Sequence, residues 1–159
     1  MKFICDLVQQ WSMDIAKHEM RINEDEIHQY TAKLLPFGSY ILDLKSHSSD
    51  IDLICVCPNF IQRSTHFFDQ LKQKLMDEKE VKHLATRENA KVPIITFFFK
   101  DINIDISFCQ LKEETIPRDI ERTISNDLLK NSIPDDASRK SLFGRKNNLM
   151  ILDLTGKQL

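Results

Sequence analysis

Two short groups of residues in this chain have the types and spacing to bind a metal-bound polyphosphate. The first is Asp50 and Asp52, which stand two positions apart at the start of the apolar run 51–56. Side chains at i and i+2 of a strand point to the same face, so the two carboxylates lie side by side. A divalent cation with oxygen ligands is the natural counter-charge for such a pair. The spacing therefore indicates a metal site, with a solvated strand end as the plainer alternative.

The second group is Gly38-Ser39, which is separated from Asp50 by the short spacer 40–49. Glycine lets the backbone approach a ligand closely, while a serine hydroxyl and backbone N–H groups can donate to phosphate oxygens. Gly-Ser alone is common in turns. Its conjunction with the paired carboxylates is what indicates a polyphosphate held through a metal.

The order of these motifs resembles the polymerase-beta-like nucleotidyltransferases and, within them, the eukaryotic poly(A) polymerases. The likeness is carried by Phe37-Gly38-Ser39-Tyr40 and by Asp50-Ile51-Asp52, followed two residues later by Cys55-Val56. Further similar segments follow in the family's order at 92–95, 102–106, 115–117, 128–131 and, in diverged form, 141–144. The resemblance covers about residues 5–154.

The resemblance implies a site for ATP and for two Mg²⁺ ions, with Mn²⁺ as the alternative ion. The implied catalytic and metal-binding residues are Asp50, Asp52 and Asp105. The implied nucleotide-binding residues are Phe37, Gly38, Ser39 and Val92.

Asp105 asks for an explanation even without the resemblance. In 102–108 the apolar side chains alternate, and Asp105 shares its strand face with Asn103 and Ser107. Aspartate is disfavoured in strands. Solvent exposure is the plain explanation, and the resemblance implies the other, which is that Asp105 is the third carboxylate of the triad.

The function that the resemblance implies is template-independent RNA adenylyl transfer. AMP would pass from ATP to an RNA 3′-hydroxyl during mRNA 3′-end polyadenylation in the nucleus. ATP and the RNA 3′ end would be the partners, together with other 3′-end processing subunits or a separate chain that supplies a missing domain. Two alternatives stay open: a non-catalytic palm-like scaffold or regulatory subunit, and a minimal nucleotidyltransferase that modifies a protein or a small molecule.

Three residues depart from the family's pattern. Asp43 replaces a glycine and could add negative charge near the phosphates, Thr96 replaces a lysine, and Phe143 replaces an asparagine that approaches the nucleotide. The central helical domain and the C-terminal RNA-binding domain of the family have no counterpart in residues 1–159. We expect a single catalytic (palm) domain that is incomplete or inactive by itself.

Composition agrees with a soluble intracellular domain. A length of 159 residues suits one domain, and a net charge of −2 offers no broad basic surface. No apolar run is long enough to span a membrane, and we expect no membrane partner. The four cysteines have no Cys-x-x-Cys spacing and read as small buried residues.

Periodicity predicts an α+β fold of the nucleotidyltransferase palm type. Helical spacing is expected over 3–20, from 23 to about 34, from 64 onward and over 137–154. Strands are expected over 51–56, 81–86, 91–99 and 102–108, with a tight turn at Lys100-Asp101. We expect a mixed, twisted sheet of about five strands, with the helices mainly on one face and the acids on the open side.

Overall fold

The computed structural model describes residues 1–42 and 50–156, and its centre is one mixed five-stranded sheet. The strand order is β1-β2-β5-β4-β3. Strands β2 and β5 are parallel, and the other neighbouring pairs are antiparallel. The strands are β1 Lys33–Phe37, β2 Ile51–Cys57, β3 Val81–Arg87, β4 Ile94–Phe99 and β5 Ile102–Gln110. The predicted α+β fold class is confirmed.

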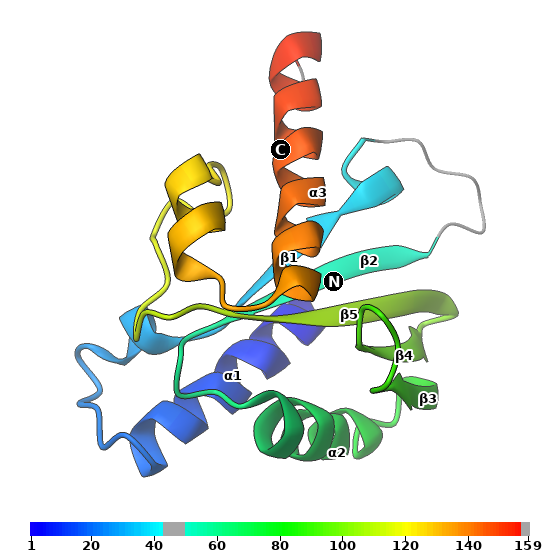
Figure 1. Ribbon diagram of the computed structural model, residues 1–159. Coiled ribbons are helices and arrows are strands. Elements are labelled where there is room, and N and C mark those ends of the chain that lie inside the picture. The colour runs from blue at the N-terminus through cyan, green and yellow to red at the C-terminus, as the bar shows by residue number, and fades with distance from the viewer. Residues whose placement is uncertain (43–49, 157–159) are drawn as a thin grey trace.

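One face of the sheet is covered by a full helical layer (Figure 1). This layer contains α1 (Lys2–His18), the π-helical segment η3 (Arg63–Leu71) and α2 (Lys72–Met76), which continues η3. The core between the layer and the sheet contains buried residues from both, including Val8 and Trp11 of α1 and Phe97 of β4. This face is called the covered face below.

The opposite face has a partial layer that consists of η4 (Leu128–Ser132) and α3 (Asp136–Thr155) (Figure 1). The expectation of helices mainly on one face describes α1, η3 and α2 but omits this second layer. The second layer forms because β2 is apolar on both of its faces. Leu53 and Cys55 are buried in the core under α1, η3 and α2. Ile54 and Val56 are buried in a second core beneath η4 and α3. A central strand that is apolar on both faces needs cover on both.

The prediction of a helix over 23–34 is wrong. The structure has only a 3₁₀ turn, η1 (Ile27–Tyr30), followed by strand β1. The pairing of β1 with β2 overrides the local helix-start signals, because β1 buries Leu35 in the second core. Pro36 is tolerated because β1 is an edge strand.

The remaining elements lie close to their predicted positions. The turn between β4 and β5 consists of Lys100 and Asp101 with φ of 51° and 63°, as a tight hairpin requires. Helix α3 begins after Asp135, whose carboxylate accepts a 2.9 Å hydrogen bond from the Ser138 backbone N–H. Within the described residues, no helix combines the length and the apolar character needed to cross a bilayer.

Candidate active site

One row of residues crosses the sheet on the face that α3 covers only in part. Phe37 of β1 is the register partner of Asp52 in β2, and Asp52 is that of Asp105 in β5. Asp105 is in turn opposite Thr96 of β4, which is opposite Ala85 of β3. These five residues are called the carboxylate row. The sequence places the two acids 53 positions apart, and the parallel pairing of β2 with β5 makes them neighbours.

Three members of the carboxylate row, Phe37, Asp52 and Asp105, form the floor of a cleft of about 340 Å³. Four of the seven residues predicted from the sequence line it, namely Phe37, Asp52, Val92 and Asp105. Its other lining residues are Leu53, Ile94, Ser107, Lys140 and Ser141. Residues of β1, β2, β4 and β5 and of the first turns of α3 therefore surround two carboxylates and one cationic side chain, that of Lys140.

The two carboxylates of the floor differ in their surroundings. Burial raises the pKa of Asp52, and the negative charges of Asp105 and then Asp50 raise it further. Asp105 accepts a 2.6 Å hydrogen bond from the Thr96 hydroxyl, and the Asn103 amide lies 3.5 Å from the same oxygen. The hydrogen bond fixes one oxygen of Asp105, while the repulsion at Asp52 favours a bound cation.

Gly38 approaches the floor from the end of β1. Its φ is +71°, and a Cβ at this position would lie 3.0 Å from Asp52 Oδ2. Both facts require glycine at this position. The Gly38 N–H donates a 2.8 Å hydrogen bond to Asn148 Oδ1, so it is already used within the protein. Ser39 follows in the 3₁₀ turn η2 (Gly38–Tyr40) and is not among the described residues that line the cleft.

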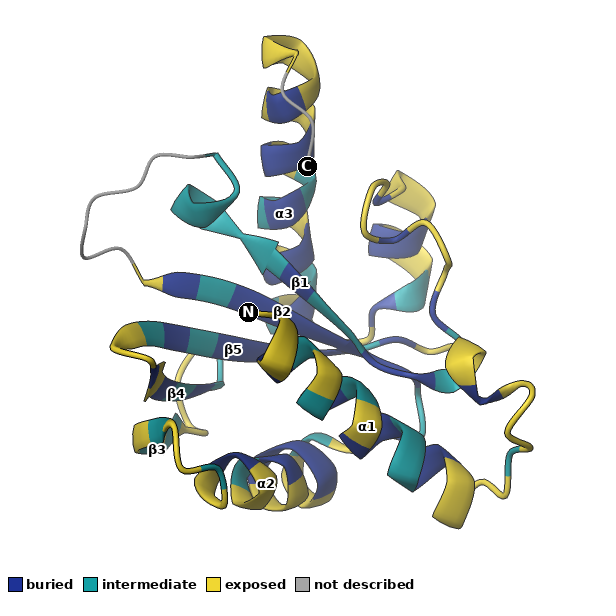
Figure 2. Cartoon of the chain, turned by 180° about the vertical axis from the view of Figure 1, so that it is seen from behind, coloured by how far each residue is buried: buried dark blue, intermediate teal, exposed yellow. Residues whose placement is uncertain are grey.

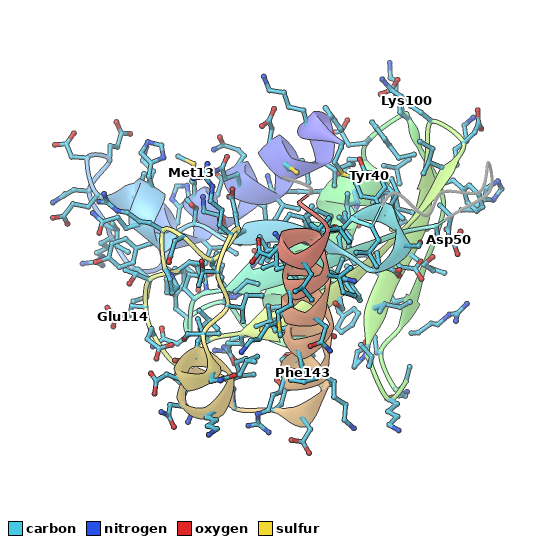
Figure 3. All side chains as sticks on the ribbon, turned by 90° about the horizontal axis from the view of Figure 1, so that it is seen from above. Met13, Tyr40, Asp50, Lys100, Glu114 and Phe143 are labelled. Carbon is cyan, nitrogen blue, oxygen red and sulfur yellow. The ribbon has the colours of Figure 1, made fainter. Side chains whose placement is uncertain are left out.

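Asp50 lies just before β2 and is exposed (Figure 3). It contributes to the raised pKa of Asp52, but it does not line the cleft. Within 1–42 and 50–156, no group of three or more His, Cys, Asp or Glu side chains has the arrangement of a metal site. The structure thus brings together two of the three predicted acids and leaves the third at the rim. Asp43 falls outside the described residues.

Helix α3 supplies residues that the sequence analysis did not assign to the site. Lys140 and Ser141 line the cleft, and Asn148 fixes the backbone of Gly38. The buried Arg145 donates to the carbonyl oxygens of Pro36 and Glu121, which anchors β1 to α3, and burial lowers its pKa to about 10. The available sequence signal was the position of Lys140 directly before the diverged motif at 141–144.

Phe143 lies away from the acidic floor. It is 52% exposed and lines a separate groove of about 510 Å³ between η4 and α3, together with Leu129 and Lys130 (Figure 3). Phe143 therefore contributes an apolar side chain to a neighbouring groove. Lys140 lines both spaces.

The fold and the cleft define an α+β domain with paired carboxylates on the open part of a mixed sheet. Residues 1–155 match the family model described as the poly(A) polymerase nucleotidyltransferase domain, and the chain belongs to this family. The resemblance seen in the sequence is confirmed.

Relatives from plants and yeast match most of this chain. It is 34% identical over 148 residues to nuclear poly(A) polymerase 3 of Arabidopsis thaliana, covering 93% of this chain and 28% of the relative. It is 38% identical over 118 residues to poly(A) polymerase pla1 of Schizosaccharomyces pombe, covering 74% and 20%. Among solved structures, the polymerase core of TRAMP, an RNA surveillance complex, is 20% identical with a TM-score of 0.46, covering 98% of this chain and 40% of that one. The chain spans between 20% and 28% of the length of the curated relatives named here.

Proposed function

We propose that this chain is the catalytic module of an RNA adenylyltransferase, which transfers AMP from ATP to an RNA 3′-hydroxyl. The observation that carries the proposal is the register pairing of Asp52 with Asp105 on the floor of the cleft, with Gly38 against the Asp52 carboxylate. Membership of the poly(A) polymerase nucleotidyltransferase family supports the reaction class. The name of the Arabidopsis relative supports a nuclear location and a role in polyadenylation.

The donor set fits a hard divalent cation. Carboxylate oxygens are ligands that Mg²⁺ and Mn²⁺ prefer, and the crowded charges at Asp52 supply the attraction. Asp52 and Asp105 would hold the metal, with Asp50 joining from the rim. A divalent ion at such a site, or a pair of ions, neutralises phosphate charge and favours the ionised form of an attacking hydroxyl.

The other residues of the cleft would position ATP. The N–H of Gly38 is occupied by Asn148, so Gly38 contributes close backbone approach and the neighbouring Ser39 hydroxyl contributes hydrogen bonding to phosphate. Lys140 provides a positive charge for the same phosphates from the side of α3. Phe37 and Val92 provide apolar walls against which the nucleoside can lie.

The reaction needs orientation and charge neutralisation more than it needs a protein nucleophile. The RNA 3′-hydroxyl would lose its proton to solvent and its oxygen would form a bond to the α-phosphorus, while the bond from that phosphorus to the bridging oxygen breaks and pyrophosphate leaves. Thr96 and Asn103 would hold the Asp105 carboxylate in one orientation throughout. Fixed charges and fixed geometry of this kind account for most of the rate in phosphoryl-type transfer.

Two observations favour the second candidate, a non-catalytic palm-like scaffold or regulatory subunit. Asp50 is exposed at the rim, and the family's lysine is Thr96, which hydrogen-bonds Asp105. The two candidates differ in whether the chain binds ATP in a Mg²⁺-dependent manner. Calorimetric titration of ATP with and without Mg²⁺ separates them directly, with Asp50→Ala as the variant that removes the acid at the rim.

The test of the enzyme is transfer of labelled AMP from ATP to a short oligoadenylate in the presence of Mg²⁺. We expect Asp105→Asn to lower the rate by at least about 100-fold, because the charge that holds the metal is lost. The matched control is Asp101→Asn, which changes a carboxylate in the β4–β5 turn, outside the cleft. An Asp105→Asn variant as active as the parent would refute the proposal. Labelled protein or small-molecule product in place of elongated RNA would favour the minimal nucleotidyltransferase.

A further inference from the structure

A second row of residues lies beside the carboxylate row on the same sheet face. Lys82 of β3 is the register partner of Phe98 in β4, and Phe98 is that of Asn103 in β5. Phe98 and Asn103 stand two positions from Thr96 and Asp105, so their side chains point to the face that carries the acids. Residues two apart on one strand are separated by about 7 Å. Lys82, Phe98 and Asn103 are called the outer row.

Phe98 is exposed although its neighbours on β4 are buried. Phe98 is 41% exposed, whereas Phe97 and Phe99 are 0% and 5% exposed. The β3 strand changes register between Lys82 and Ala85, and within this irregularity His83 has a φ of 53°. The His83 ring lies 6.0 Å from the Phe98 ring at an interplanar angle of 89°, an edge-to-face contact. The irregular strand thus brings a second aromatic ring beside the exposed one.

The charge next to this aromatic pair is positive. Lys82 is exposed, and within the described part of the chain it has no ion-pair partner. Lys100 at the nearby hairpin turn is instead paired with Glu80 at 3.4 Å and lies over the Phe99 ring. An exposed aromatic ring beside an unpaired lysine has the chemistry that recognises single-stranded nucleic acid, with the base on the ring and the phosphate on the cation.

We propose that Phe98, with His83 and Lys82, is a platform on which a base near the RNA 3′ end stacks. This inference rests on the proposed function, because it assigns the path of the RNA to a part of the same sheet face. The platform is continuous with the acidic floor through Asn103, which lies within 3.5 Å of Asp105 Oδ1. An RNA whose base stacks on Phe98 has its phosphate backbone within reach of Lys82. The next nucleotide of that RNA then lies at the carboxylate row. The RNA therefore enters the cleft over β3 and β4, the side opposite α3.

The experiment is fluorescence anisotropy with a fluorescein-labelled short oligoadenylate and the full chain, without ATP or divalent metal. Phe98→Leu keeps an apolar side chain but removes the ring. Since base–aromatic stacking contributes about 1–3 kcal/mol per base, we expect the Kd to rise roughly 5- to 150-fold. Phe98→Trp keeps the ring and is expected to retain the parent affinity. The matched control is Ile102→Ala, which changes an exposed apolar residue that alternates onto the other face of the sheet.

A second variant tests the charge. Lys82→Gln is expected to weaken oligoadenylate binding and to make the slope of log K against log salt shallower by about one unit, because one phosphate is no longer neutralised by a lysine. Phe98→Leu is expected to leave this slope unchanged, because it removes no charge. Equal RNA affinity in the parent and in Phe98→Leu, or a loss of affinity in Phe98→Trp equal to that in Phe98→Leu, would overturn the platform.

The base that stacks on Phe98 could belong to the RNA or to ATP, and calorimetric titration of ATP with Mg²⁺ distinguishes the two. We expect Phe98→Leu to leave ATP affinity unchanged; a loss of ATP affinity with RNA affinity intact would assign the platform to the adenine of ATP and overturn the assignment to RNA. Failure of the proposed function has a different signature. It would show as ATP binding that does not depend on Asp52 and Asp105, whereas the anisotropy experiment involves neither ATP nor metal.

Discussion

Phe97 and Phe98 are adjacent on β4, yet they belong to two very different surfaces of one sheet. Phe97 lies on the covered face, where α1, η3 and α2 exclude water from it (Figure 2). Phe98 lies on the opposite face, where α3 packs against β5 and β1 rather than over β3 and β4. The covered face holds the larger core, and the open face holds the paired carboxylates. On β4, core packing and solvent-exposed side chains therefore lie on opposite faces of one strand.

The helices explain why this separation occurs. Helix α1 presents Ile4, Val8, Trp11 and Ile15 at helical spacing, and all four are buried against the covered face. Helix α3 behaves differently, because its C-terminal turns project beyond the sheet and expose Met150 and Leu154 (Figure 2). A helix that stands on one end of the sheet leaves room beside it, and the cleft occupies that room.

The largest expected effect comes from repeating one substitution on both faces. Phe97→Ala should lower the free energy of unfolding by about 3–5 kcal/mol, because it leaves a cavity in a closed core. Phe98→Ala should lower it by less than about 1 kcal/mol, because Phe98 is already partly solvated. Urea unfolding followed by circular dichroism measures both. Equal losses would show that the open face contributes to stability as much as the covered face does.

The next effect isolates the contact between Gly38 and Asp52. Gly38→Ala and Gly156→Ala both place a side chain at a positive φ, +71° and +67°, which costs about 1–3 kcal/mol. Only Gly38→Ala also brings a Cβ to 3.0 Å from Asp52 Oδ2, since no atom of residues 1–42 and 50–156 lies within 4 Å of the corresponding Cβ at Gly156.

We therefore expect both variants to lose thermal stability, Gly38→Ala more than Gly156→Ala because of the added contact, and we expect Gly38→Ala alone to lose affinity for ATP with Mg²⁺. Thermal unfolding and calorimetry on the same preparations give both numbers. If Gly156→Ala lost as much ATP affinity as Gly38→Ala, backbone strain alone would explain the loss, and the contact with Asp52 would have no role.

The sequence was sufficient to predict the elements of the covered face and the two acids that line the cleft. Helix α1 and strands β2 to β5 follow local periodicity, and Asp52 and Asp105 stand out as acids in apolar strands. Strand β1 could not be predicted, because residues 23–34 carry helix-start signals and the strand is defined only by its pairing with β2. This is a case in which tertiary pairing overrides local propensity.

The contacts that α3 makes with the end of β1 could not be predicted from local sequence either. Asn148 contacts Gly38 across 110 positions of sequence, and Arg145 contacts Pro36 across 109. Neither residue has a motif of its own. Asp50 shows the opposite limitation, since its spacing to Asp52 predicted a shared position in the site and the structure leaves it exposed just before the first residue of β2. Spacing on a strand determines the face, whereas exposure depends on what the rest of the chain places above that face.

The smallest effect concerns the cost of the acidic floor to stability. The pKa of Asp52 is raised in the folded chain by burial and by the charges of Asp105 and Asp50, so its ionised form is less favourable folded than unfolded. This penalty is complete above the folded pKa, falls as the pH drops toward the unfolded value, and is absent below it. Asp52→Asn should therefore raise the melting temperature of the metal-free chain slightly at neutral pH, and the gain should vanish in acid.

Thermal unfolding across pH checks this, with Asp69→Asn on the exposed side of η3 as the control for removing one negative charge. An Asp52→Asn variant less stable than the parent at neutral pH, or a gain that persists in acid, would contradict it. Added Mg²⁺ sharpens the test, because a cation that relieves the repulsion should stabilise the parent more than the variant. The repulsion between Asp52 and its neighbouring carboxylates, which lowers the free energy of unfolding of the metal-free chain, would then also favour binding of the cation.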